Sequence, residues 1–147
     1  MANTNRVLLV ANRTAMTPAL REEVRKRAAA GDATFHLVVP AHPSGLHRLV
    51  DPEVAGREAA QDRMEEALAA LGEAAGSAPV TGEVGDADPI AAIHDAMNSR
   101  DFDEIVISTL PKRVSKWLRV DLPSKARGLG LPVTHIESIP AGESVAA

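Results

Sequence analysis

The chain has 147 residues, a net charge of −4 and no cysteine. This length fits one domain spanning residues 1–147 with a single hydrophobic core. The lack of cysteine excludes disulfides, thiolate metal sites and cysteine nucleophiles, and it fits a reducing, cytoplasmic location. The start of the chain lacks a signal-peptide layout, and every apolar run is far shorter than the roughly 20 residues that span a bilayer, so no membrane partner is expected.

The charges are unevenly spread along the chain. Residues 51–104 carry 14 acidic and 3 basic side chains, whereas residues 105–147 carry 6 basic and 3 acidic ones. The overall acidity and the scarcity of aromatic residues argue against a nucleic-acid partner. The basic C-terminal third favours instead a small anionic ligand.

Four short runs rich in Val, Leu and Ile predict buried strands, and Pro79–Val84, with two valines, predicts a further strand of weaker pattern. They cover residues 6–11, 34–39, 79–84, 104–108 and 131–136. The last residues of the chain, from about 138, are expected to form a flexible tail.

Helix signals lie between the strands. Thr17 and Pro18 predict a helix start and Gly31 its end, and a longer helix is expected over residues 53–75. Asp88 and Pro89 predict a third start, and residues 111–130 a helix in two pieces that break near Asp121. Strands alternating with helices predict an α/β fold, a doubly wound, five-stranded parallel sheet with helices on both faces, which is a three-layer sandwich.

Ligands of such sheets bind beyond the carboxyl ends of the strands. The candidates there are Asn12 and Arg13 after the first strand, Gly85 and Asp86 after the third, and Ser108 and Thr109 after the fourth. The two hydroxyls could be nucleophiles only with a base nearby, and no such pair stands at a recognisable spacing, so no catalytic residue is predicted. His42 and His47, in the loop after the second strand, are too weak a signal for a metal site.

Three stretches carry a family resemblance. They are Val7–Val10, Gly85–Ile90, and Asp103–Thr109 followed about twenty residues later by Leu131–Ile136. In this layout the chain resembles the universal stress protein family. The resemblance implies a flavodoxin-like fold of the adenine nucleotide alpha hydrolase-like group, with strand order 2-1-3-4-5 and the last strand at a sheet edge. It also implies a regulatory domain, a homodimer joined along residues 133–136, and ATP or AMP as ligands.

ATP-binding members of that family carry a G-x2-G-x9-G-[ST] motif after the fourth strand. Its positions fall here on Ser108, Pro111, Asp121 and Leu122, so all four residue types differ. Pro111 has no backbone N–H, Asp121 would repel phosphates, and Leu122 has no hydroxyl. The family's first-strand aspartate falls on Asn12. We therefore expect weak or absent ATP binding.

The same segment is rich in cations. Lys112, Arg113, Lys116 and Arg119 surround Ser115 and Trp117. Lys112, Arg113, Ser115 and Arg119 are candidates for holding a phosphate or carboxylate. The alternative is a solvated helix face with the tryptophan packed beneath it.

Two functions remain open. One is a non-catalytic, cytoplasmic regulatory domain of the universal stress type that binds a nucleotide or another small anion. The other is a nucleotide-dependent enzyme of the same fold group, working by adenylyl or phosphoryl transfer. The enzyme would need a glycine-rich phosphate loop, which residues 12–16 lack.

Overall fold

The computed structural model describes residues 4–41 and 52–139. Five parallel strands form one sheet in the order β3-β2-β1-β4-β5. The strands are β1 (Asn5–Val10), β2 (Ala33–Pro40), β3 (Val80–Gly85), β4 (Glu104–Thr109) and β5 (Val133–Glu137). The helices are α1 (Pro18–Ala30), α2 (Pro52–Ala75), α3 (Pro89–Ser99), α4 (Lys116–Arg119) and α5 (Leu122–Arg127). The α/β class and the alternation of elements are confirmed.

The strand order differs from the expected 2-1-3-4-5. β1 is central between β2 and β4, and β3 lies at the outer edge beyond β2. β3 suits an edge because it carries two glycines and Glu83 and none of its residues is fully buried. β4 is buried over almost its whole length, as a strand beside the centre must be. β5 lies at the opposite edge, as expected.

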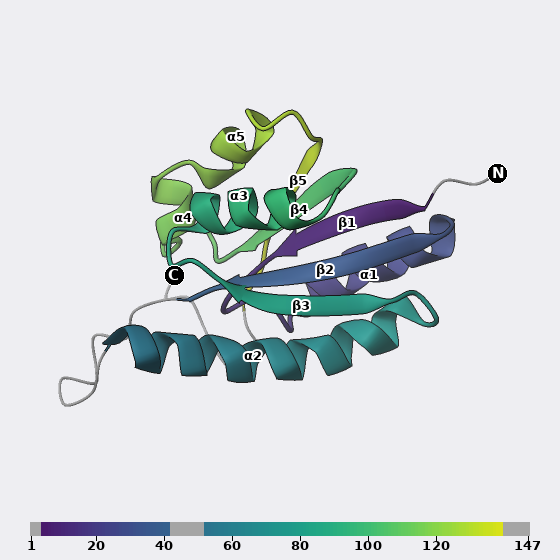
Figure 1. The fold of residues 1–147 in the computed structure, drawn as a ribbon, viewed down its shortest axis with the longest axis horizontal. Helices are drawn as coiled ribbons and strands as arrows, with labels where there is room; N and C mark the ends of the chain where they lie inside the picture. Colours follow the sequence, from purple (N-terminus) through teal and green to yellow (C-terminus); the bar gives the residue numbers. More distant parts are fainter. Residues whose placement is uncertain (1–3, 42–51, 140–147) are drawn as a thin grey trace.

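Helices cover both faces of the sheet (Figure 1). Side chains alternate along each strand, so Val7 and Leu9 join α1 and α2 in one core, whereas Leu8 and Val10 join α3 and α5 in the other. The two cores form the three-layer sandwich that the sequence predicts.

The helix ends agree with the sequence in position but not always in chemistry. Asp88 caps α3 by accepting a hydrogen bond from the Ile90 N–H at 3.1 Å, and Gly31 ends α1. Thr17 precedes α1 without capping it, because its hydroxyl donates to the Thr14 carbonyl at 2.9 Å. Asp121 precedes α5 in a left-handed conformation, with φ 53° and no side-chain cap. Thr17 and Asp121 therefore occupy the N-cap positions of α1 and α5, where the sequence places the helix starts, but neither side chain makes a capping hydrogen bond.

Part of the expected tail is held in place. The Ser138 N–H donates to the Thr109 carbonyl, and its hydroxyl donates to Thr17 at 3.0 Å. Residues 140–147, and the loop with His42 and His47, lie outside the described residues. Within the described ranges, none of the helices is long and apolar enough to cross a membrane, and no group of three metal-ligating side chains occurs.

Candidate functional site

The switch in strand order lies at β1. The chain runs from β1 outward to β2 and β3, and then returns to place β4 on the other side of β1. The segments that leave β1 and β4 therefore diverge, and they open a cavity of about 310 Å³ at the carboxyl ends of the two strands. We call this cavity the β1–β4 pocket. It is lined by Asn12, Arg13, Thr14, Pro40, Ala59, Ala60, Arg63, Ala87, Ser108, Thr109, Leu110, Val114, Ser115, Lys116 and Trp117.

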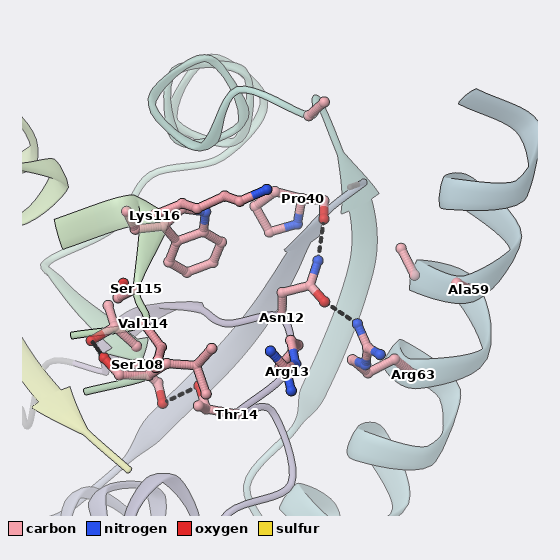
Figure 2. Close-up of a pocket in the computed structure, with 15 residues that line it drawn as sticks. Asn12, Arg13, Thr14, Pro40, Ala59, Arg63, Ser108, Val114, Ser115 and Lys116 are labelled. Atoms are coloured by element: carbon pink, nitrogen blue, oxygen red, sulfur yellow. Dashed lines mark hydrogen bonds between the residues drawn. The ribbon is translucent and has the colours of Figure 1, made fainter. Parts of the chain in front are cut away.

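The charge of the pocket has one sign. Its lining includes Arg13, Arg63 and Lys116, and none of the described lining residues is Asp or Glu. Arg63 comes from α2 on one side and Lys116 from α4 on the other, and the side chain of Lys116 points toward Pro40 (Figure 2). Three cations without a carboxylate favour an anionic ligand.

Asn12 forms hydrogen bonds with residues on two sides of the pocket. Its Nδ2 donates to the Pro40 carbonyl at 2.6 Å, and its Oδ1 accepts a hydrogen bond from Arg63 Nη1 (Figure 2). Both ends of the amide are therefore engaged by β2 and α2. Asn12 thereby orients a guanidinium at the cavity.

The hydroxyls of the floor are bonded to one another or to backbone. Thr14 Oγ1 and Ser108 Oγ lie 2.6 Å apart, and both residues are buried. Ser115 caps α4, where its Oγ accepts from the Leu118 N–H at 3.2 Å. These bonds fix the turn after β1 against β4 and set the start of α4 at the pocket rim.

Thr109 lies within hydrogen-bonding distance of His135, a contact that the sequence did not predict. Its Oγ1 lies 2.8 Å from His135 Nε2 on the neighbouring strand β5, and also 2.8 Å from the Leu110 carbonyl. Burial lowers the pKa of His135; Glu137 opposes this and Arg127 adds to it. The imidazole is therefore held neutral more strongly than an exposed one.

The structure brings together half of the residues proposed from the sequence. Asn12, Arg13, Ser108, Thr109 and Ser115 line the pocket. The other five do not line it, and they are Gly85, Asp86, Lys112, Arg113 and Arg119. The last three are exposed on the turn before α4 and at the end of α4.

Gly85 and Asp86 have local structural roles. Gly85 ends β3, and a Cβ added there would lie 2.8 Å from Ala92 Cβ. Asp86 accepts a hydrogen bond from the Asp88 N–H at 2.9 Å. Ala87, the next residue in this turn, is the one that lines the pocket.

Sequence reasoning missed the contribution of α2. Arg63 lies beside the apolar stripe of that helix, where a solvated cation is the ordinary expectation. Only the packing of α2 against the sheet brings Arg63 to Asn12, which is 51 residues away in the chain. No local signal marks it. The sequence places Lys116 and Trp117 in the basic segment, but it does not show that they line the pocket.

Two of the four positions that we aligned with the ATP motif have local structural roles. The carbonyl of Pro111 accepts hydrogen bonds from the N–H groups of Val114 and Ser115, which closes a tight turn. Leu122 is 1% exposed and belongs to the α3–α5 core. Neither side chain is a hydrogen-bond donor.

No family model matches the chain, and no curated protein matches it. Solved structures do match it in fold. A universal stress protein family member from Burkholderia pseudomallei has a TM-score of 0.61 and 14% identity, covering 91% of this chain and 96% of that one. This chain has the universal stress protein fold.

Two further structures with this fold were solved with nucleotides. One is the universal stress protein from Archaeoglobus fulgidus in complex with dAMP, with a TM-score of 0.54, 19% identity, and coverage of 93% of this chain and 100% of that one. The other is a universal stress protein in complex with cAMP, with a TM-score of 0.52, 15% identity, and coverage of 92% and 98%. The likeness runs over nearly the whole chain, and at these identities it establishes the fold.

Proposed function

We propose that this chain is a non-catalytic, cytoplasmic regulatory domain of the universal stress protein type, which binds a small anionic ligand in the β1–β4 pocket. The observation that carries the proposal is the lining of that pocket at the switch point of the sheet, which holds three cations and, among the described residues, no carboxylate. The fold supports it, because related folds were solved with dAMP and cAMP.

The exposed cations outside the pocket have a second role in this proposal. Lys112, Arg113 and Arg119 raise the local concentration of anions near the opening. Because they are exposed, their effect is screened by salt, whereas contacts inside the pocket are screened much less. Arg113→Ala should therefore weaken binding only at low ionic strength.

Filling the pocket tests the proposal. Ala59 and Ala69 are both exposed alanines of α2, but only Ala59 lines the cavity. Calorimetric titrations with AMP, cAMP and a panel of small organic anions should find at least one ligand for the native chain. Ala59→Phe should abolish that binding, and Ala69→Phe should leave it within about twofold. Equal affinity in both variants would place the ligand elsewhere and refute the proposal.

We further propose a homodimer joined along β5. An edge strand exposes unpaired N–H and C=O groups, and pairing with the same strand of a second copy satisfies them. β5 has no lysine to deter pairing, and its polar side chains are Thr134, His135 and Glu137.

A nucleotide-dependent enzyme is the second candidate, and one observation favours it. Thr109 Oγ1 lies 2.8 Å from His135 Nε2, a base that could take the hydroxyl proton in place of the Leu110 carbonyl, which is also 2.8 Å away. In that case incubation with Mg-ATP should release ADP or AMP, and Thr109→Val should abolish the release. No turnover above a buffer blank rejects this candidate and leaves the binding proposal intact.

A further inference from the structure

A second group of polar side chains lies away from the β1–β4 pocket, on the outer edge strand β3 (Figure 1). His36 of β2 pairs in register with Thr81 of β3, so the two side chains lie on one face of the sheet. Glu83 shares that face, because it lies two residues after Thr81. The face is the one covered by α3, since the ring of His36 stacks on Phe102 of the α3–α5 core, with centroids 6.1 Å apart. The register therefore brings together a hydroxyl, an imidazole and a carboxylate.

The hydroxyl of Thr81 contacts the imidazole of His36. Thr81 Oγ1 lies 2.7 Å from His36 Nδ1 and 3.4 Å from the Phe35 carbonyl oxygen. The second distance exceeds the usual length of an O–H···O hydrogen bond, roughly 2.5–3.0 Å, so the imidazole is the closer acceptor for the hydroxyl proton. Thr81 is exposed, whereas His36 is only 3% exposed. A hydroxyl open to solvent therefore lies against a shielded ring.

The surroundings of the second ring nitrogen favour one tautomer of His36. Nε2 is buried, makes no hydrogen bond to the described residues and lies 3.4 Å from Glu83 Oε2. An N–H at this position faces a carboxylate, whereas a lone pair there would face a negative charge. The proton of the neutral ring therefore belongs on Nε2, which makes Nδ1 the acceptor for Thr81. Burial lowers the pKa of His36, Arg100 lowers it further and Glu83 opposes them, so the ring is neutral near pH 7.

A guanidinium contacts the same hydroxyl. Arg100 follows the last residue of α3, and its Nη1 donates to Thr81 Oγ1 at 3.2 Å. A cation there stabilises the negative charge that develops on the oxygen when its proton leaves for His36. Arg100 is exposed and carries further N–H donors, whose planar fork matches a phosphate group. The hydroxyl thus has both a base and an anion-binding group in contact with it.

The position of Thr81 restricts the kind of molecule that reacts with it. Thr81 is exposed on an edge strand and does not line the β1–β4 pocket, so an incoming molecule gains little binding energy from the walls of a cavity. The donor must therefore bring its own good leaving group, and Arg100 favours one that carries phosphate charge. Acyl phosphates combine both properties in a small molecule.

We propose that Thr81 is a modification site, at which the hydroxyl accepts an acyl group from a small acyl phosphate. Thr81 Oγ1 attacks the carbonyl carbon while His36 Nδ1 takes the hydroxyl proton. The bond from that carbon to the bridging oxygen breaks, an ester remains on Thr81, and phosphate leaves with the bonding electrons and the proton. Arg100 binds the phosphate, and Glu83 stabilises the transient imidazolium. Each chain reacts once, so this inference goes beyond the proposed function without requiring turnover.

Peptide mass spectrometry of the chain after exposure to acetyl phosphate tests the site. Thr134 is the matched residue on the opposite edge strand, β5. Its Oγ1 accepts a hydrogen bond from Arg27 at 3.3 Å, but within the part of the chain that the structure describes no hydrogen bond joins it to an imidazole. We expect the ester to form on Thr81 about 100-fold faster than on Thr134, as is usual for a general base. Alkaline hydroxylamine removes the ester and spares lysine amides. Labelling of Thr81 no faster than that of Thr134 overturns the proposal.

Two variants separate reactivity from exposure. His36→Asn places a polar atom near the position of Nδ1 but supplies no base, so ester formation should slow about 100-fold. Thr81→Val should remove the ester. An unchanged rate in His36→Asn, with its fold checked by circular dichroism, overturns the role of the base. If His36→Asn does not fold, the pH profile of the native chain carries the test.

The pH profile distinguishes a general base from a structural histidine. Because the pKa of His36 lies below its ordinary value of about 6.5, the native rate should be level from about pH 7 to pH 9. An unassisted hydroxyl reacts faster throughout this range as its alkoxide fraction rises. Glu83→Gln should lower the level rate, whereas Glu73→Gln, which removes an exposed carboxylate of α2, should not. A native rate that rises over the whole range overturns the mechanism.

Two donors test the role of Arg100. Arg100→Gln should slow the reaction of acetyl phosphate about tenfold more than that of 4-nitrophenyl acetate, an acetyl donor without phosphate, since a charge-assisted hydrogen bond is worth about that factor or more. Arg57→Gln, which removes another exposed cation, should slow neither. Equal losses with both donors overturn the choice of acyl phosphate. Thr81→Val should leave ligand binding in the β1–β4 pocket unchanged, so failure of this inference leaves the proposed function standing.

Discussion

Gly85 is packed so closely that the structure leaves no room for a side chain. A Cβ added at Gly85 would lie 2.8 Å from Ala92 Cβ and 2.9 Å from Val38 Cγ1, both well inside ordinary contact distance. Neither neighbour can swing away, because the methyl of Ala92 is fixed to the backbone of α3 and Val38 is fully buried in β2. Gly85→Ala therefore requires α3 to move. Overpacking of this kind costs about 1–3 kcal/mol.

Urea unfolding measures this cost against a matched substitution. Gly72 lies inside α2, and a Cβ added there meets nothing within 4 Å. Gly72→Ala should therefore stabilise the protein by about 0.5–1 kcal/mol, because alanine loses less backbone freedom in a helix. The two substitutions add the same methyl group and should move the midpoint in opposite directions, with unchanged slopes.

The same pair of variants separates packing from ligand binding at Gly85. If Gly85→Ala leaves the free energy of unfolding within about 0.5 kcal/mol of the native value, the close packing against α3 is refuted. If stability is unchanged and ligand affinity falls, the earlier expectation of a binding role for this glycine is the better one.

Three further predictions follow from the same structure. Calorimetry with Mg-ATP should give weak or no binding, and a micromolar dissociation constant in the β1–β4 pocket contradicts the interpretation of the altered motif. Sedimentation velocity at micromolar concentration should give a dimer that Val133→Lys converts to a folded monomer, as checked by circular dichroism; a monomeric native chain rules the β5 interface out. Stability should fall with pH below about 6.5, because burial lowers the pKa of His36, Arg100 lowers it further, and Glu83 only partly opposes them. Because the pKa of His36 is lower in the folded chain, the unfolded chain binds a proton at this histidine more readily, and acid therefore favours unfolding. His36→Gln should flatten this dependence, and an unchanged slope assigns it to other groups.

The sequence alone determined the elements. The strand predicted over residues 104–108 is β4, Glu104–Thr109, and the helix predicted to stop at Gly31 ends at Ala30. These features depend on the alternation of apolar residues and on glycine at a helix end, which are local properties of the chain. Candidate residues at the carboxyl ends of strands, such as Asn12 and Ser108, also follow from the sequence, because parallel topology fixes where those ends lie.

The sequence alone predicted the side-chain cap of α3, but not the hydrogen bonding at the starts of α1 and α5. Asp88 caps its helix as expected, whereas the hydroxyl of Thr17 donates to the Thr14 carbonyl and Asp121 adopts a left-handed conformation. Residues of types that favour the N-cap position, Thr or Asp, stand before all three helices. At Thr17 the difference comes from the neighbouring turn, since a hydroxyl that could accept from a helix N–H can instead donate to a nearby carbonyl.

Only the tertiary structure decided the strand order and the composition of the pocket. β3 pairs with β2 at the edge, although the local sequence would also allow it a place beside β1. Arg63 reaches Asn12 across 51 residues, and His135 reaches Thr109 across 26. No local pattern records these contacts, because they depend on which strands lie side by side and on which helix covers each face. That choice is made by the burial of the whole sheet, in which every strand competes for the positions that exclude the most water.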